Sequence, residues 1–208
     1  MSVAFDFSDR VAVVTGSCGA LGSAVVAAFA DAGATVAACD IVDIDAADSL
    51  LEPRENVAFY QADFTDEAVV ADTVDQIVSD HGRIDCLVNV AGTWRGGDPV
   101  EETDTDLFEM LFDINLKTMF LATKHALPAL QETGGSVVSI SARSGLEGGT
   151  GDGLYRATKA SVRILTETVA EENLGTVRAN CVMPSVLDTP MNREMMDPKD
   201  EWVDPTDI

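Results

Sequence analysis

A tyrosine and a lysine four residues apart carry the clearest chemistry in this sequence of 208 residues. They are Tyr155 and Lys159, in the stretch YRATK. Residues at positions i and i+4 share one face of a helix, so the ammonium group would lie beside the phenol. A cation held there stabilises tyrosinate and lowers the pKa of the phenol from its usual value of about 10. The pair therefore indicates a phenol that can give or take a proton near neutral pH.

A glycine-rich turn near the N-terminus has the composition of a phosphate-binding site. It is TGSCGALG, residues 15–22, and it lies between an apolar run typical of a strand and a helical stretch. Glycines let the backbone approach a dinucleotide pyrophosphate, and the amides and dipole of the following helix attract its charge. In this context the motif predicts a dinucleotide site. Its expected cofactor-binding residues are Gly16, Gly19, Leu21 and Gly22.

An acidic residue, Asp40, ends the second strand-like run, about 20 residues after the glycines. Its carboxylate can accept hydrogen bonds from the ribose hydroxyls of a dinucleotide. It would repel a 2′-phosphate, and no arginine or lysine adjoins it. The sequence therefore favours NAD(H) over NADP(H).

Strand-length apolar runs alternate with amphipathic helical stretches along the whole chain. The expected strands are residues 11–15, 35–40, 57–62, 86–90, 136–141 and 177–183. The expected helices are residues 20–32, 66–81, 103–131 and 153–173, with stops at Gly33, Gly82, Gly134 and Gly175. The runs are nearly continuous in hydrophobicity, as in strands covered on both faces. We expect a Rossmann-type doubly wound parallel sheet, a three-layer α/β/α fold in a single domain over residues 1–208.

The charge balance narrows the choice of partners. Asp and Glu total 36 against 13 Lys and Arg, a formal net charge of -23. Such a surface repels nucleic-acid phosphates and anionic lipid, so neither is an expected partner. The acidity indicates either an ordinary acidic protein or, as we favour, a halophilic one from a salt-adapted cytoplasm. There, about 1 M salt shortens the Debye length to about 3 Å and screens the self-repulsion.

Other sequence features indicate a soluble, cytoplasmic protein. Residues 1–10 lack the pattern of a signal peptide, and no run of 18 apolar residues occurs. The cysteines are scattered without a C-x-x-C motif, and both histidines are isolated, so we expect reduced thiols and no metal site. The four cysteines are Cys18, Cys39, Cys86 and Cys181.

Taken together, the motifs resemble the short-chain dehydrogenase/reductase family, from about Arg10 to the last residue. The family's Thr-Gly-x-x-x-Gly-x-Gly motif is matched except that Ala20 replaces the middle glycine, with Gly19 just before it. The resemblance implies an oxidoreductase that transfers hydride between NAD(H) and a small carbonyl or alcohol substrate. It also implies that Tyr155 gives or takes the substrate proton, while Lys159 tunes it and holds the nicotinamide ribose.

The resemblance assigns roles to further residues. Asp63 matches the position that contacts adenine, and Asn115 matches a helix asparagine that supports the lysine through water. The stretch NVAG at residues 89–92 matches the family's Asn-Asn-Ala-Gly. A turn beside the nicotinamide, in which Ser185 replaces a glycine, follows the last strand. The cofactor-binding residues expected from these matches are Asp63, Asn89, Ala91, Gly92, Pro184 and Thr189, together with Tyr155 and Lys159.

The family's serine is the main departure. It usually lies thirteen residues before the tyrosine, where this chain has Ala142. Neighbouring side chains on a regular strand point to opposite faces, so Ser141 would turn away. Three alternatives stay open: an irregular strand end turns Ser141 inward, Ser144 substitutes from the loop, or no serine acts. We carry Ser141 as a candidate catalytic residue.

Three stretches, residues 90–97, 121–125 and 187–193, resemble the quinonoid dihydropteridine reductases within the family. Those enzymes also lack the serine and prefer NADH, so reduction of a quinonoid dihydropterin is the alternative function. A non-catalytic NAD-binding sensor or scaffold is a third possibility, and the intact tyrosine–lysine pair argues against it. The family continues with a helix and a last strand, which this sequence lacks although residues 204–207 resemble the helix start. Where that end is complete, we expect a homodimer or homotetramer.

Overall fold

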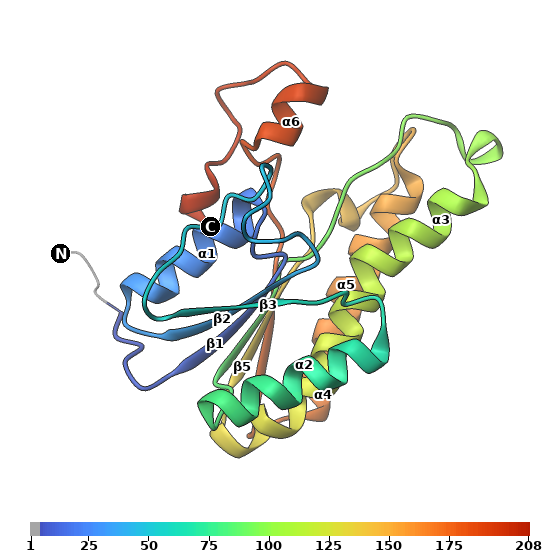
Figure 1. Cartoon of the computed structure of the whole chain (residues 1–208). Helices are drawn as coiled ribbons and strands as arrows, with labels where there is room; N and C mark the ends of the chain where they lie inside the picture. The colour runs from blue at the N-terminus through green and yellow to red at the C-terminus, as the bar shows by residue number, and fades with distance from the viewer. Residues whose placement is uncertain (1–4) are drawn as a thin grey trace.

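Within residues 5–208, six parallel strands form the centre of the molecule (Figure 1). The computed structural model describes these residues; residues 1–4, on which the expectation about a signal peptide partly rests, lie outside the described part. The strand order is β3-β2-β1-β4-β5-β6. The strands are β1 (Val11–Thr15), β2 (Thr35–Asp40), β3 (Val57–Gln61), β4 (Cys86–Asn89), β5 (Ser136–Ile140) and β6 (Arg178–Val182).

The strand order reverses at β1, which pairs with both β2 and β4. Thr15, the last residue of β1, is in register with Cys39 on one side and Asn89 on the other. The three segments that leave these strands therefore start side by side. In doubly wound sheets, ligands bind in the crevice outside the carboxyl ends of the strands at such a reversal.

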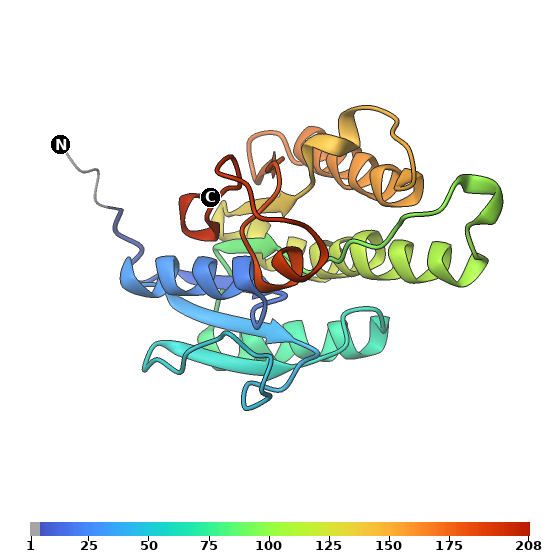
Figure 2. The same cartoon turned by 90° about the horizontal axis from the view of Figure 1, so that it is seen from above.

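Helices cover both faces of the sheet (Figures 1 and 2). One face packs against α1, through a core that joins Val26 to Val14 and Val36 of the strands. The other face packs against α2 and α4, through a second core around Ile77 and Leu130. Helix α5 packs against β5 and β6. The main helices are α1 (Ala20–Asp31), α2 (Glu67–His81), α3 (Thr105–Phe112), α4 (Thr118–Thr133), α5 (Gly153–Glu172) and α6 (Pro190–Met195). Three 3₁₀ turns are η1 (Val100–Glu102), η3 (Arg143–Leu146) and η4 (Pro205–Asp207).

Local sequence explains where helix α2 begins and ends. The Asp66 side chain accepts hydrogen bonds from the amides of Ala68 and Val69, which satisfies donors that the first turn leaves free. Gly82 ends the helix with φ of 78°, a left-handed conformation that glycine adopts without strain.

A π turn, η2 (Asp113–Lys117), interrupts the long helical stretch between α3 and α4. The sequence predicts one helical stretch here, and its amphipathic pattern does not reveal the extra residue that a π turn holds. The turn carries Asn115, whose side chain is buried. Single π turns inside α-helices often lie at functional sites.

The predicted fold class is confirmed: the chain is an α/β protein with a Rossmann-type parallel sheet. Expected strands and helices agree with the observed ones to within two residues at each end. The predicted helix start at residues 204–207 is a single 3₁₀ turn, in which Asp204 accepts a hydrogen bond from the Thr206 amide. That turn, η4, lies against α1, as Figure 1 shows near the C-terminus.

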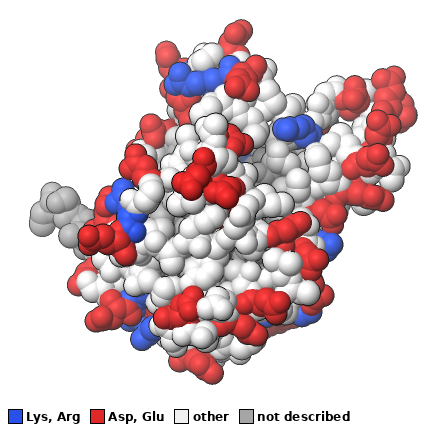
Figure 3. All heavy atoms as spheres, viewed as in Figure 1, with Lys and Arg blue, Asp and Glu red and all other residues white. Residues whose placement is uncertain are grey.

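Acidic side chains are spread over the visible surface and outnumber the basic ones (Figure 3). Among the helices of residues 5–208, none is long and apolar enough to cross a membrane. The same residues contain no cluster of three or more side chains suited to hold a metal ion. All four cysteines are free, with Cys18 and Cys39 fully buried and the other two partly buried.

Candidate active site

Tyr155 and Lys159 lie on one face of the first turns of α5. The Lys159 ammonium nitrogen is 5.9 Å from the centre of the tyrosine ring. It donates a hydrogen bond of 3.0 Å to the Ile140 carbonyl at the end of β5. The lysine side chain is buried, and this burial lowers its pKa to about 8. The carboxyl end of β5 and helix α5 together therefore hold the ammonium group in place.

The pKa of the Tyr155 phenol is shifted in the direction opposite to the one that the sequence predicts. Burial, and then the negative charge of Asp152, raise the pKa of the phenol to about 12. The expectation was that Lys159 would lower it. The lysine lies over the ring of the tyrosine and has itself lost part of its affinity for a proton, so burial dominates in the protein alone. Near neutral pH the phenol is protonated, which is the state of a proton donor.

Asn115 is held at the site by a pair of hydrogen bonds to one residue. Its Oδ1 accepts from the Thr93 amide at 2.7 Å, and its Nδ2 donates to the Thr93 carbonyl at 3.0 Å. The same Nδ2 donates to Thr158 of α5 at 3.1 Å. A Cβ added to Gly92 would lie 3.1 Å from both Asn115 Oδ1 and Lys159 Nζ. Sequence reasoning placed Asn115 and Gly92 here but missed Thr93, which gives no motif of its own.

Ser141 does not supply a free hydroxyl. It is buried, and its hydroxyl donates a hydrogen bond of 2.7 Å to the backbone carbonyl of Lys159. The proton that a catalytic serine would offer is therefore engaged with α5, and the assignment of Ser141 to catalysis is not supported. Ala142 follows in extended conformation and is buried. Ser144 lies in η3, where its carbonyl accepts a hydrogen bond from Arg156.

The glycine turn after β1 brings backbone against backbone. A Cβ on Gly22 would lie 1.9 Å from the Gly16 carbonyl oxygen, and one on Gly16 would lie 2.8 Å from the backbone of Ala91. Gly19 has more space, because its nearest neighbour is 3.5 Å away. Leu21 is buried, and within residues 5–208 the buried hydroxyl of Ser17 has no hydrogen-bond partner. The close backbone approaches fit a bound dinucleotide pyrophosphate.

Asp40 turns its carboxylate toward the glycine turn. One oxygen accepts a hydrogen bond of 2.8 Å from the Cys18 amide, and the other accepts one of 3.0 Å from the Val42 amide. The carboxylate is therefore held beside the phosphate-binding loop, with lone pairs left for ribose hydroxyls. Asp63 lies after β3, where its carboxylate accepts hydrogen bonds from the Thr65 amide and hydroxyl.

The remaining sequence-predicted residues divide between the crevice and the sheet. The backbone amide of Ala91 donates to the Thr15 hydroxyl at 3.3 Å, which joins the β4 end to the β1 end. The Asn89 side chain donates to Thr123 of α4 and to Ser139 of β5, so it braces the sheet and helix. Thr189 caps α6 by accepting from the Asn192 amide. The Pro184 carbonyl accepts from the Arg143 amide, which ties the turn after β6 to η3.

A cavity of about 250 Å³ lies beside the first turn of α5. Its walls come from the loop after β4, from η1 and α3, and from the loop that precedes α5. They mix charged and apolar side chains, among them Arg95, Asp98, Asp152, Val100, Phe108 and Leu154. A space of this size and lining suits a small molecule with polar groups.

Comparison with known proteins decides the family. The family model described as short chain dehydrogenase matches residues 10–200. The chain belongs to the short-chain dehydrogenase/reductase family. Tyr155 and Lys159 are thus the residues that match this family's Tyr-x-x-x-Lys motif, on the helix where such a pair shares one face.

Relatives within the family act on different substrates. L-fucose dehydrogenase of Mus musculus is 34% identical over 196 residues, which are 94% of this chain and 71% of that protein. A short-chain dehydrogenase/reductase structure from Brucella melitensis, named glucose/ribitol dehydrogenase, has a TM-score of 0.90 at 28% identity. The match covers 99% of this chain and 88% of that one. The structure of ElxO with NADP bound has a TM-score of 0.85 at 26% identity, over 95% of this chain and 87% of that one.

Proposed function

We propose that this enzyme transfers hydride between NAD(H) and a small carbonyl or alcohol substrate, with Tyr155 as the proton donor and acceptor. The observation that carries the proposal is the meeting of Tyr155, Lys159 and Asn115 beside Gly92, at the carboxyl ends of β4 and β5. A nicotinamide dinucleotide supplies or removes the hydride when bound. Gly16, Gly22 and Asp40 would hold its pyrophosphate and adenosine ribose.

In the direction of carbonyl reduction, the substrate oxygen gains negative charge and needs a proton. Tyr155 is protonated near neutral pH and faces Lys159, so its phenol donates the proton while the ammonium group stabilises the tyrosinate that forms. Asn115 keeps the strand end at Gly92 and helix α5 at a fixed spacing through Thr93 and Thr158. Ala142 stands where the family has a serine and offers no hydroxyl. Tyr155 is therefore the residue that donates a proton to the negatively charged substrate oxygen.

The preference for NAD(H) rests on Asp40. Its carboxylate is fixed by the Cys18 and Val42 amides and would meet the 2′-phosphate of NADP(H) with a negative charge. The bound NADP of ElxO belongs to that relative, so the preference of this chain is a separate question.

A second candidate reaction is the reduction of a quinonoid dihydropterin. Ala142 is buried in the serine position and the Ser141 hydroxyl is engaged, so the site offers one donor fewer to a developing oxyanion. Loss of such a donor typically costs about 3–4 kcal/mol of transition-state stabilisation. An already electrophilic quinonoid ring depends less on that donor than a ketone does.

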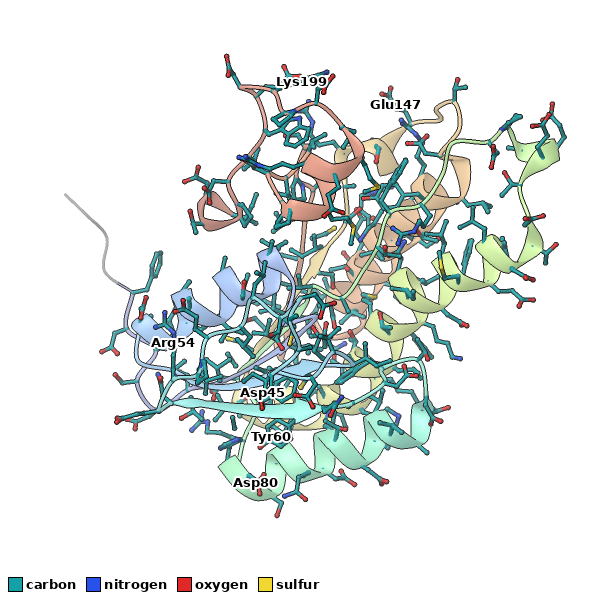
Figure 4. All side chains as sticks on the ribbon, turned by 45° about the horizontal axis from the view of Figure 1, so that its top comes forward. Asp45, Arg54, Tyr60, Asp80, Glu147 and Lys199 are labelled. Carbon is teal, nitrogen blue, oxygen red and sulfur yellow. The ribbon has the colours of Figure 1, made fainter. Side chains whose placement is uncertain are left out.

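A substrate panel tests both reactions. The panel contains simple ketones and a quinonoid dihydropterin, each with NADH or NADPH, and aldoses and secondary alcohols, each with NAD⁺ or NADP⁺. Activity with a carbonyl or alcohol that is lost in Tyr155→Phe and kept in Tyr60→Phe supports the main proposal. These are the two tyrosines of the chain, and Tyr60 lies on β3 beside Asp80 of α2, as labelled in Figure 4. Cofactor binding without turnover of any compound would favour the sensor or scaffold.

The setting that we propose is a salt-rich cytoplasm, with the chain in a homo-oligomer. The net charge of -23 destabilises the folded state by self-repulsion at low ionic strength. The melting temperature should therefore rise by several degrees as KCl increases from low to molar concentration, because screening weakens this repulsion. A melting temperature that stays flat or falls in differential scanning calorimetry would contradict salt adaptation.

A further inference from the structure

One arginine holds the loop between β5 and α5. The Arg156 Nε donates a hydrogen bond of 2.6 Å to Asp152 in an ion pair, and both side chains are mostly buried. Its Nη1 donates to the carbonyls of Ser144 and Glu147 at 3.3 Å and of Gly148 at 3.5 Å. Figure 4 labels Glu147 on this loop. A single guanidinium thus gathers three carbonyls and a carboxylate onto the start of α5.

The loop is built around this guanidinium. A Cβ on Gly149 would lie 2.2 Å from Arg156 Cζ, so the backbone passes too closely for a side chain. A Cβ on Gly148 would meet no atom within 4 Å. Further along the loop, the Gly151 carbonyl accepts a hydrogen bond of 2.6 Å from the Gly97 amide. The loop after β4 is thereby joined to the loop that Arg156 holds.

The same loop packs against the helix that carries the proposed proton donor. A Cβ on Gly145 of η3 would lie 2.9 Å from the Ala160 amide nitrogen, one residue after Lys159. Tyr155 is partly buried, and burial is the largest cause of its raised pKa. Asp152, whose charge is the second cause of the raised pKa, is the carboxylate that Arg156 holds, so the arginine and the phenol share one neighbour.

We propose that Arg156 is a positioning residue for Tyr155: its guanidinium clamps residues 144–152 onto the first turn of α5 and keeps water away from the phenol. The proposal rests on the proposed role of Tyr155 as proton donor. The clamp also fixes one wall of the cavity beside α5, because Gly149, Gly151 and Asp152 line that cavity. The charges that face the phenol are those of Asp152 and Lys159, on or beside α5. Arg95, Asp98 and Asp104 lie in the wall of the cavity beside α5.

Two pairs of matched variants isolate the clamp. Arg156→Lys keeps the positive charge beside Asp152 but replaces a planar fork by a point donor, which does not reach four acceptors at once. Its control is Arg163→Lys, the same change on the same helix, where Arg163 pairs with Glu167. Gly149→Ala forces the loop backbone and the guanidinium apart, whichever of them moves, and leaves the Arg156 residue unchanged. Its control is Gly148→Ala, which enters open space.

Both readouts work without a known substrate. The first is amide hydrogen exchange by NMR at Gly97 and Gly145, whose amides donate to Gly151 and Ala142. The second is the tyrosinate absorbance of Tyr155 after stopped-flow jumps to alkaline pH, recorded in a Tyr60→Phe background that leaves one tyrosine. We expect exchange about tenfold faster in Arg156→Lys and Gly149→Ala than in their controls. We also expect the tyrosinate midpoint to fall by about half a unit to one unit as water reaches the phenol.

The outcomes separate the two proposals. If Arg156→Lys and Gly149→Ala match their controls in both exchange and tyrosinate midpoint, the clamp is overturned, whatever the enzyme's activity. Faster exchange with an unchanged midpoint would also overturn it, because Arg156 would then hold the loop without affecting Tyr155. Once a substrate is in hand, the clamp predicts a lower kcat with unchanged NADH affinity in Arg156→Lys. Failure of the substrate panel alone would leave the exchange and midpoint results standing.

Discussion

The two halves of the crevice are built in different ways. On the cofactor side, the turn after β1 works through missing side chains, since Gly16 and Gly22 allow backbone atoms to meet. On the substrate side, Asn115, Lys159 and Arg156 work through side chains that reach backbone carbonyls and amides far along the chain. The first half centres on eight consecutive residues, joined by Ala91 and Asp40 from neighbouring strand ends, and the second is assembled from separate segments. The halves should therefore fail differently when single residues are changed.

The substrate side should show the largest effect, in catalysis and not in binding. Tyr155→Phe removes the proton donor, so kcat should fall by about 10²–10⁴-fold. The NADH dissociation constant should change little, and steady-state kinetics with cofactor titration by fluorescence would measure both. Tyr60→Phe, whose hydroxyl contacts Asp80 and His81 away from the crevice, should keep full activity. Full activity in Tyr155→Phe would disprove the mechanism and leave the fold intact.

The cofactor side should fail in binding and stability together. In Gly22→Ala the new Cβ would lie 1.9 Å from a backbone oxygen, so the turn must open. We expect a loss of about 2–3 kcal/mol in unfolding free energy by urea denaturation, with much weaker NADH binding. Gly19→Ala is the matched control for stability, because its Cβ would have ordinary contact distances. Equal losses of unfolding free energy in the two variants would show that backbone approach is not what the turn requires.

Replacing Lys159 should raise the stability of the protein and abolish its activity. Its pKa in the folded protein is about 8, against 10.5 for an ordinary lysine. The unfolded chain therefore binds more protons between these values, and the unfolding free energy rises with pH across that window. At pH 7, below both pKa values, the folded protein bears the full free-energy cost of burying the charged ammonium group. Lys159→Met should stabilise the protein by about 2 kcal/mol at pH 7, after the loss of the bond to Ile140, and abolish turnover.

Urea unfolding at pH 7 and pH 10 measures this effect. The advantage of Lys159→Met should be largest at pH 7 and shrink as the pH approaches 10.5. Lys199→Met, which changes an exposed lysine in the tail, should show no such trend. If Lys159→Met is no more stable than the unmodified protein at pH 7, then burial of the Lys159 ammonium does not destabilise the folded state.

Asp40 should show the smallest of these effects, and its clearest sign should be a change in cofactor choice. Asp40→Ala removes the charge that opposes a 2′-phosphate, so the ratio of NADPH to NADH dissociation constants should fall by about tenfold, roughly 1.4 kcal/mol. Asp43→Ala, a neighbouring acid that does not contact the glycine turn through Cys18, is the control. Equal affinity of the unmodified protein for both cofactors would contradict the preference itself.

Sequence reasoning was strongest where function depends on contiguous residues. The parallel sheet with helices on both faces follows from the alternation of apolar runs and helical stretches, and the glycine turn and Asp40 meet because β1 and β2 end in register. It was weaker where the effect depends on surroundings. The spacing of Tyr155 and Lys159 predicted their shared face, but the direction of the phenol pKa came from burial and Asp152, which no spacing reveals.

The serine question shows the same limit at one residue. The sequence left Ser141, Ser144 and no serine as alternatives, and the answer depends on which acceptor the Ser141 hydroxyl meets. That acceptor is a backbone carbonyl eighteen residues away in the chain. Arg156 could have been noticed from its spacing to Asp152, since Asp-x-x-x-Arg favours an ion pair on one helix turn. The three carbonyls that it also binds carry no signal in the sequence.

The π turn at Asp113–Lys117 rotates the side-chain directions of α4 relative to those of α3. Each residue of an α-helix advances the side-chain direction by about 100°. The extra residue lets Asn115 face Thr93 and Thr158 while Leu121, Ala126 and Leu130 still face the core behind the sheet. Removing one residue from this turn would leave a regular helix with good hydrogen bonds. It would also swing either the asparagine or the apolar face by about a quarter of a revolution, so the helix tolerates substitutions in this segment more readily than deletions.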